Sequence, residues 1–232
     1  MAPPNQRSLI SRLAIRTVIV VPLCLLVLFV PAGSLRFWQG WVFVGLTIGA
    51  GVLQTVYLYR RDRELLERRM RNREPSGEQK RFRVLWIPLW IAIIVLPGLD
   101  YRFGWSRTLL AAVPLWLELL SQGFIAGSQF VMFQVLKVNT FASSTIQIEA
   151  GHKVISTGPY GVVRHPLYSG ILLMILFTPT ALGSYVSLPV SALLVPVLLY
   201  RLIHEERMLR TSLPGYSDYC LQTRFRLVPF VW

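Results

Sequence analysis

Five long apolar runs constrain this chain more than any other feature of its sequence. They cover residues 13–31, 37–59, 84–99, 108–136 and 169–200. A helix needs about 20 apolar residues to cross a hydrocarbon core of ~30 Å, so these runs approach or exceed the length of a membrane span. The last run is too long for one span and is interrupted by Pro179, Gly183, Pro189 and Pro196. We predict a helical hairpin that turns near Gly183 and Ser184, which gives six spans, with five as the alternative.

The composition agrees with a membrane protein. Hydrophobic residues make up 53% of the 232 and charged residues only 15%, whereas a soluble domain carries about 25% charged residues. The charges are missing from whole stretches rather than diluted evenly. We therefore predict an all-α fold, a polytopic membrane helical bundle with a pocket on the cytoplasmic side. The two cysteines, Cys24 and Cys220, have neither metal-ligand nor disulfide-framework spacing, so we expect no metal.

The net charge of +13 comes from basic residues that lie between the apolar runs. This distribution favours anionic membrane lipids over nucleic acid as the partner. Ten Lys and Arg fall in 60–83, while the connections 32–36 and 100–107 hold few. The positive-inside rule therefore predicts that the N-terminus, 60–83, 137–168 and the C-terminus are cytoplasmic. We interpret 60–83 as a solvated helical extension of the second span.

Two regions of different character divide the chain. Residues 1–136 hold four predicted spans and the basic loop 60–83, and residues 137–232 hold most of the polar sequence blocks. An alternative for the start is a signal peptide at Val18–Val30, followed by the small-residue site Pro31-Ala32-Gly33. Removing it would leave an odd number of spans.

The first polar block runs from Gly151 to Gly170. Proline restrains the residue before it, so 151–165 should be an irregular loop, with Pro166 in the first turn of the next helix. A helix that begins there presents backbone N–H groups to an anion such as a carboxylate. Three aromatic side chains lie nearby: Tyr160, His165 and Tyr168. The alternative is an interfacial loop that Arg164 anchors at the lipid headgroups.

The second block, Arg201–Leu209, should continue the helix of the last apolar run. Its adjacent carboxylates, Glu205 and Glu206, are costly if they are buried without partners. If the two blocks bind a small cofactor that contains a ribose, one of these carboxylates would accept hydrogen bonds from the ribose hydroxyls. Its negative charge would also favour a sulfonium nearby. The alternative is a helix emerging into water, with Glu205 paired to Arg201 and Glu206 paired to Arg210.

A turn at Pro214-Gly215 should follow the second block, and then a short amphipathic helix on the membrane surface. In this interpretation Arg226 meets lipid phosphate.

Together these blocks resemble the isoprenylcysteine carboxyl methyltransferase family and its phospholipid methyltransferase relatives. The resemblance covers about 137–232. The matching pieces are His152–Ile155, Gly158-x-Tyr160, Arg164-His165-Pro166-x-Tyr168-x-Gly170, Glu205-Glu206-x-x-Leu209 and Gly215-Tyr216-x-x-Tyr219. It implies an integral membrane methyltransferase that uses S-adenosylmethionine. The implied reaction is carboxyl O-methylation of a lipophilic, isoprenylcysteine-like acceptor, either a small molecule or a prenylated substrate.

The resemblance also implies site residues. The family's cofactor contacts fall on Gln147, His152, Lys153, Val154, Ile155, Tyr160, His165, Pro166, Leu167, Tyr168 and Glu205, with Glu206 as a further candidate. Gln147 stands one position out of the family's register. Arg201 matches the arginine on the substrate side, and Arg201 with Glu205 would carry the catalysis. If the acceptor were an amine, His165, Glu205 or Glu206 would serve as its base.

Two other functions fit parts of the sequence. A membrane NADPH-dependent sterol or enone reductase can end in a similar His-Pro-x-Tyr helix, but 137–168 has few basic residues for a second phosphate. A non-enzymatic transport subunit would place ionisable groups near mid-membrane. Here the charges cluster at one face, and the exception is Glu118 in the fourth run. We expect Glu118 either to bond to a neighbouring helix or to lie in a polar cavity.

Overall fold

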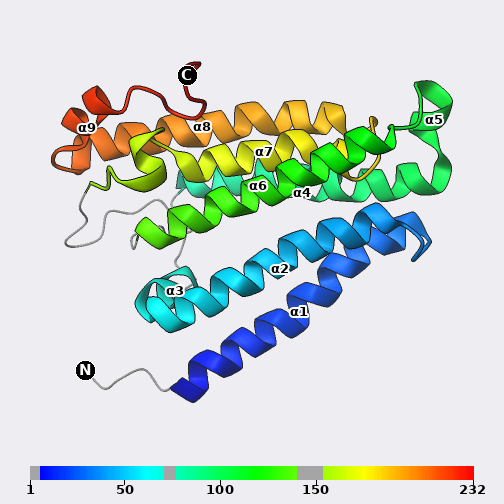
Figure 1. The fold of residues 1–232 in the computed structure, drawn as a ribbon, viewed down its shortest axis with the longest axis horizontal. Helices are drawn as coiled ribbons and strands as arrows, with labels where there is room; N and C mark the ends of the chain where they lie inside the picture. Colours follow the sequence, from blue (N-terminus) through cyan, green and yellow to red (C-terminus); the bar gives the residue numbers. More distant parts are fainter. Residues whose placement is uncertain (1–5, 71–76, 140–153) are drawn as a thin grey trace.

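The computed structural model describes residues 6–70, 77–139 and 154–232, which form a helical bundle (Figure 1). The elements in chain order are α1 (Gln6–Ala32), α2 (Trp38–Arg61), α3 (Arg63–Met70), α4 (Gly77–Phe103), α5 (Trp105–Leu109), α6 (Leu115–Val138), the 3₁₀ turn η1 (Gly158–Gly161), α7 (Pro166–Ala181), α8 (Leu188–Ser212) and α9 (Tyr216–Gln222). The all-α membrane architecture predicted from the apolar runs is confirmed.

Within the described residues, five helices are long and apolar enough to cross a membrane, namely α1, α2, α4, α6 and α8. Helix α7 is apolar but has only 16 residues. It pairs with α8 as the predicted hairpin, whose turn includes Gly183 at φ +70°. The starts of α1 and α7 lie at the same end of the bundle as the end of α8, with α5 at the opposite end (Figure 1).

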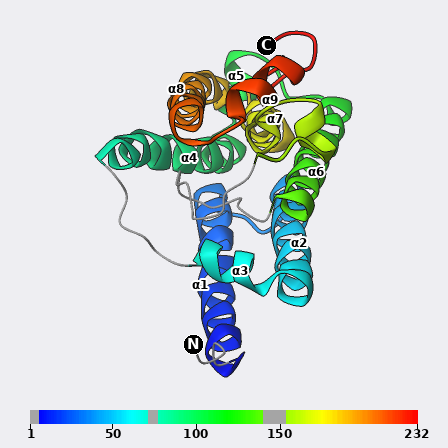
Figure 2. The same cartoon turned by 90° about the vertical axis from the view of Figure 1, so that its left-hand side faces the viewer.

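Helix α7 lies between α6 and α8 (Figure 2). Helix α4 packs against α7 and α8, while α1 packs on α4 and α2 packs on α6. The contact of α1 with α4 is close, because a Cβ at Gly98 would lie 2.8 Å from the carbonyl oxygen of Leu28. Small residues at such crossings let membrane helices approach each other. Helix α1 is therefore packed as a member of the bundle.

The interpretation of 60–83 as an extension of the second span is wrong. Helix α2 ends at Arg61, and Asp62 leaves the helical conformation. The Asp62 carboxylate then accepts the backbone N–H of Leu65 and so caps the separate helix α3. Leu65 and Leu66 are buried in a cluster with Leu58 of α2, which holds α3 against the bundle.

The fourth apolar run also differs from its prediction. Instead of one helix over 108–136, α5 ends at Leu109 and α6 begins at Leu115. Pro114 precedes α6 in an extended conformation and has no backbone N–H to continue a helix.

Glu118 lies in a buried polar cluster at the end of the bundle that holds α5. Its carboxylate accepts a hydrogen bond from Gln39 Nε2 of α2 at 3.1 Å. The side-chain amide of Gln122 donates to the carbonyl oxygens of Gln39, at 3.2 Å, and Ala181, at 2.8 Å. Glu118 is thus bonded to a neighbouring helix, the first of its two expected environments. The cluster connects α2, α6 and the end of α7.

We predict that Gly183→Ala destabilises the protein by about 1–3 kcal/mol, because the residue has a positive φ. The new Cβ would also lie 2.8 Å from Glu118 Oε1. Gly127→Ala in α6 is the matched control, since a Cβ there meets nothing within 4 Å. Thermal unfolding in detergent should show a loss for the first variant and little change for the second. Equal melting temperatures for the two variants would contradict the constraint at Gly183.

Candidate functional site

The two polar blocks meet at one end of the bundle. Tyr168 in the first turn of α7 donates its hydroxyl proton to Glu205 Oε2 near the end of α8, at 2.5 Å. Arg201 Nε, one helical turn earlier on α8, donates to the same Tyr168 oxygen at 2.9 Å. Residues 33 and 37 positions apart in sequence therefore form one connected group. The family resemblance implied that residues of both blocks lie at one site, and the two blocks do lie together.

The start of α7 has the geometry expected of an anion-binding helix terminus. Pro166 occupies the first turn, and His165 at the N-cap makes no side-chain hydrogen bond that caps the helix. Among the described residues, no side chain therefore caps the N–H groups of this turn. Before it, the loop turns through η1, where Gly158 has φ +60°. The prediction of an irregular loop followed by a helix at Pro166 is confirmed for 154–166.

The C-terminal tail, residues 223–232, holds this loop in place by backbone pairing. The N–H of Arg164 donates to the Phe225 carbonyl at 2.8 Å, and the N–H of His165 donates to the Arg226 carbonyl at 2.9 Å. Ser169 Oγ donates to the Leu227 carbonyl at 2.6 Å. The last residues of the chain are thus part of the structure around the site.

Glu206 is the centre of a buried ion-pair network, and its side chain is only 5% exposed. Arg164 Nη2 lies 3.0 Å from Oε1, Arg210 Nη2 lies 2.9 Å from the same oxygen, and Arg226 Nε lies 2.6 Å from Oε2. The pairing with Arg210 is the one expected for a helix that emerges into water. Both Glu206 oxygens are occupied by arginines, so its carboxylate connects the loop before α7, α8 and the tail.

Two arginines have partners other than lipid: Arg226, which we expected to meet lipid phosphate, and Arg164, which only the alternative for the first block placed at the headgroups. Arg164 is buried, and its Nη1 donates to the carbonyls of Thr223, at 3.0 Å, and Arg224, at 2.8 Å. Arg226 is directed to Glu206 and stacks on Trp232, 4.9 Å from the ring centroid. Both interpretations were wrong because the tail folds back onto the loop and brings buried acceptors within reach.

Tyr160 is held at both ends. Its hydroxyl accepts from Asn139 Nδ2 at 2.6 Å, and its carbonyl accepts from the Tyr219 hydroxyl at 2.7 Å. Burial raises the pKa of Tyr160 to about 12, so its phenol is neutral at physiological pH. The sequence did not indicate Asn139 as a partner of Tyr160. Asn139 reaches Tyr160 because α6 ends beside η1.

Helix α9 packs on the protein through one face. Tyr216, Tyr219 and Cys220 are buried in a cluster with Leu213, against which Val154 and Tyr160 pack. The exposed residues of α9 are Ser217, Asp218, Leu221 and Gln222, and its place on the membrane surface stays a prediction.

His165 is buried next to the Glu206 network. Its Nε2 lies 3.5 Å from the Tyr216 hydroxyl and 3.9 Å from Glu206 Oε2. Burial lowers the pKa of His165 to about 4, because desolvation and the neighbouring charges of Arg164 and Arg226 outweigh the attraction of Glu206. The imidazole is therefore neutral at physiological pH.

The remaining predicted cofactor residues are placed as follows. Val154, Ile155 and Leu167 are half-buried, and Pro166 is buried at the start of α7. Gln147, His152 and Lys153 lie outside the described residues.

The sequence also did not indicate Phe82 of α4, whose ring centroid lies 4.6 Å from the Arg201 guanidinium carbon. An aromatic residue in an apolar helix carries no signal that separates it from ordinary core packing.

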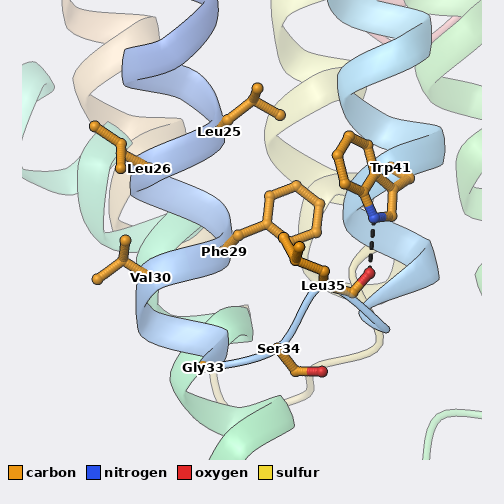
Figure 3. A pocket seen from close by; sticks show the side chains of 8 residues that line it. All are labelled: Leu25, Leu26, Phe29, Val30, Gly33, Ser34, Leu35 and Trp41. Atoms are coloured by element: carbon orange, nitrogen blue, oxygen red, sulfur yellow. Dashed lines mark hydrogen bonds between the residues drawn. The ribbon is translucent and has the colours of Figure 1, made fainter.

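A separate hollow lies between α1 and α2 at the opposite end of the bundle (Figure 3). Its lining is almost entirely apolar, and it includes Leu26 and Leu35, which are exposed. Trp41 Nε1 donates to the Leu35 carbonyl at 2.8 Å beside it. These walls suit lipid hydrocarbon and offer few groups to a polar cofactor.

The bundle and its polar end define an integral, multi-pass membrane protein. Residues 118–211 match the family model of the isoprenylcysteine carboxyl methyltransferase (ICMT) family. The resemblance predicted from the two polar blocks is thereby confirmed. The matched segment begins in α6, before the boundary that we placed at residue 137, and ends before α9 and the tail.

We predict that Glu206→Gln lowers the free energy of unfolding by about 3 kcal/mol, because it leaves buried Arg164 without its counter-charge. Arg210→Ala should cost less than about 1 kcal/mol, since the Arg210 side chain is 44% exposed. Denaturant unfolding in detergent compares the two variants. Similar small losses for both would mean that Glu206 is not the centre of the network.

We predict that acid destabilises the protein through His165. Below its ordinary pKa of about 6.5, this histidine binds a proton in the unfolded chain but not in the folded one. Stability should therefore fall from about pH 6.5 towards pH 4, by roughly 3 kcal/mol in full. Melting temperatures between pH 7.5 and 5 measure the loss. His165→Gln should reduce it, whereas the control His204→Gln should keep it.

Proposed function

We propose that the protein transfers the methyl group of S-adenosylmethionine to the carboxylate of a lipophilic, isoprenylcysteine-like acceptor. The observation that carries the proposal is the connected group Tyr168, Glu205 and Arg201, formed where α7 begins and α8 ends. This group places an acceptor of hydrogen bonds, a phenol and a guanidinium side by side at the end of an apolar hairpin. The family match over α6, α7 and α8 supports the same reaction.

The chemistry of the described residues fits the cofactor. Glu205 can accept hydrogen bonds from ribose hydroxyls, and the uncapped first turn of α7 suits a carboxylate. Tyr160, His165 and Tyr168 provide aromatic surfaces nearby, with His165 neutral. S-adenosylmethionine supplies the methyl group on a positively charged sulfonium. We assign Glu206 to holding the loop and Glu205 to binding.

Arg201 would orient the acceptor. A planar guanidinium binds a carboxylate through charge-assisted hydrogen bonds, and the same positive charge disfavours an amine in its cationic form. A carboxylate is already a nucleophile, so this reaction requires no general base on the protein. The contribution of the protein is alignment and exclusion of water, which can lower a barrier by up to roughly 7–11 kcal/mol.

We place this end of the bundle in the cytoplasm. The short helix α3 and the start of α1 lie at the same end as the site (Figure 1), and the basic segment 60–83 includes α3. The positive-inside rule orients that segment towards the cytoplasm. The lipophilic acceptor would then enter sideways from the cytoplasmic leaflet.

We predict that Arg201→Ala and Glu205→Ala each lower methyl transfer by about 100-fold or more, because misplacing a reactant by about 1 Å can cost that much. The assay follows radiolabel from S-adenosylmethionine into a lipid extract and tests the product for base-labile methyl ester. Arg207→Ala, an exposed site on the same helix, is the control and should keep its activity. Undiminished transfer by both variants would remove the site assignment. A base-stable product would instead exclude a carboxylate acceptor.

A further inference from the structure

We propose that Phe82 is a positioning residue that fixes the plane of the Arg201 guanidinium, so that the acceptor carboxylate is received at the seam between α4 and α8. The inference depends on the proposed function, which it deepens by naming the helix that completes the acceptor side. Phe82 lies in the second turn of α4, at the same end of the bundle as the site.

Two contacts of the guanidinium restrain how it lies. Its Nε donates to the Tyr168 hydroxyl at 2.9 Å, which holds one edge. Its carbon lies over the Phe82 ring, 4.6 Å from the ring centroid. The ring therefore restrains the guanidinium from a second direction, in addition to the hydrogen bond at Nε.

Phe82 is itself held by other aromatic residues. Its ring stacks on Trp86 with centroids 5.1 Å apart, and Trp86 stacks on Trp90 at 5.5 Å. The spacing of four residues places all three on one face of α4. Trp86 and Trp90 pack against the buried cluster that contains Tyr168 and Leu202. Tyr168, which holds one edge of the Arg201 guanidinium, and Phe82, whose ring restrains it from a second direction, are thus tied to the same core.

Neighbouring residues of α4 outside this row are more exposed. Val84 is 70% exposed and Leu85 is 57% exposed, as expected for side chains that meet lipid. The row Phe82, Trp86 and Trp90 is therefore the face that α4 presents to α8. Because Phe82 and Arg201 come from these two helices, a carboxylate that meets Arg201 arrives at the end of their seam.

Helix α4 lies outside the segment that matches the family, which begins at residue 118. The described residues that we assign to the cofactor come from the matched segment, whereas Phe82 comes from α4. We infer that the acceptor side of the site is built partly by this unmatched region of the chain.

The test compares Phe82→Leu, Phe82→Trp and the control Leu85→Ala, which removes apolar surface from the lipid-facing side of the same helix. Two equilibrium constants are measured in detergent for each protein. One is for S-adenosylhomocysteine, and the other is for an isoprenoid thioether carboxylate that represents the acceptor. Phe82→Leu should weaken binding of the carboxylate about 3- to 30-fold, the range expected for a lost cation–π contact. Binding of S-adenosylhomocysteine should stay within about twofold.

Phe82→Trp keeps an aromatic face and should restore most of the carboxylate affinity. In an Arg201→Lys background, Phe82→Leu should cause little further loss, because its effect passes through the guanidinium. Leu85→Ala should leave both constants unchanged. Where methyl transfer is detected, the KM for the acceptor should rise more than kcat falls.

Equal weakening of both ligands by Phe82→Leu would show a general structural role and overturn the inference. So would unchanged carboxylate binding, or losses that multiply in the Arg201→Lys background. Failure of the proposed function is a separate outcome. In that case wild-type protein would transfer no methyl group, while the Phe82 variants would still change carboxylate binding in the predicted order.

Discussion

A charged carboxylate that is buried in the bundle needs positively charged partners. The partners of Glu206 organise the polar end of the molecule. Its counter-charges come from three segments: Arg164 from the loop before α7, Arg210 from α8 itself and Arg226 from the tail. Removing a buried charge from water costs several kcal/mol unless partners replace the water. The chain can satisfy Glu206 only by bringing the loop and the tail to α8. The charge of Glu206 therefore holds the loop before α7, helix α8 and the tail together.

The two neighbouring carboxylates have different partners. Successive residues of an α-helix point about 100° apart, so Glu205 and Glu206 face different surroundings from the same turn of α8. Glu206 meets the arginines, and Glu205 meets Tyr168. The network that fixes the backbone of this turn also fixes the direction of Glu205. In our proposal the structural ion pairs thus orient the binding group without touching the ligand.

The sequence predicted the helices and the hairpin because span length and apolar character are local properties of each run. It failed at α3 and at the break before α6, where burial of Leu65 and Leu66 and the geometry at Pro114 decide the outcome. For the site, the family resemblance implied that Tyr168 and Glu205 belong to one cofactor site. It could not reveal the tail, since the tail's bonds to Arg164 and His165 use backbone carbonyls that every residue has. Phe82 was equally hidden among the other aromatic residues of its helix.

Helix α7 has 16 residues, which at 1.5 Å per residue makes it about 24 Å long. This is shorter than a hydrocarbon core of ~30 Å. If its far end is level with the outer edge of that core, its first turn ends inside the bilayer rather than at the water. Tyr168 would then lie inside the hydrocarbon core, just below the headgroups. A lipid acid could present its polar end there while its tail stays dissolved in the leaflet, so the substrate would never have to be extracted from the membrane.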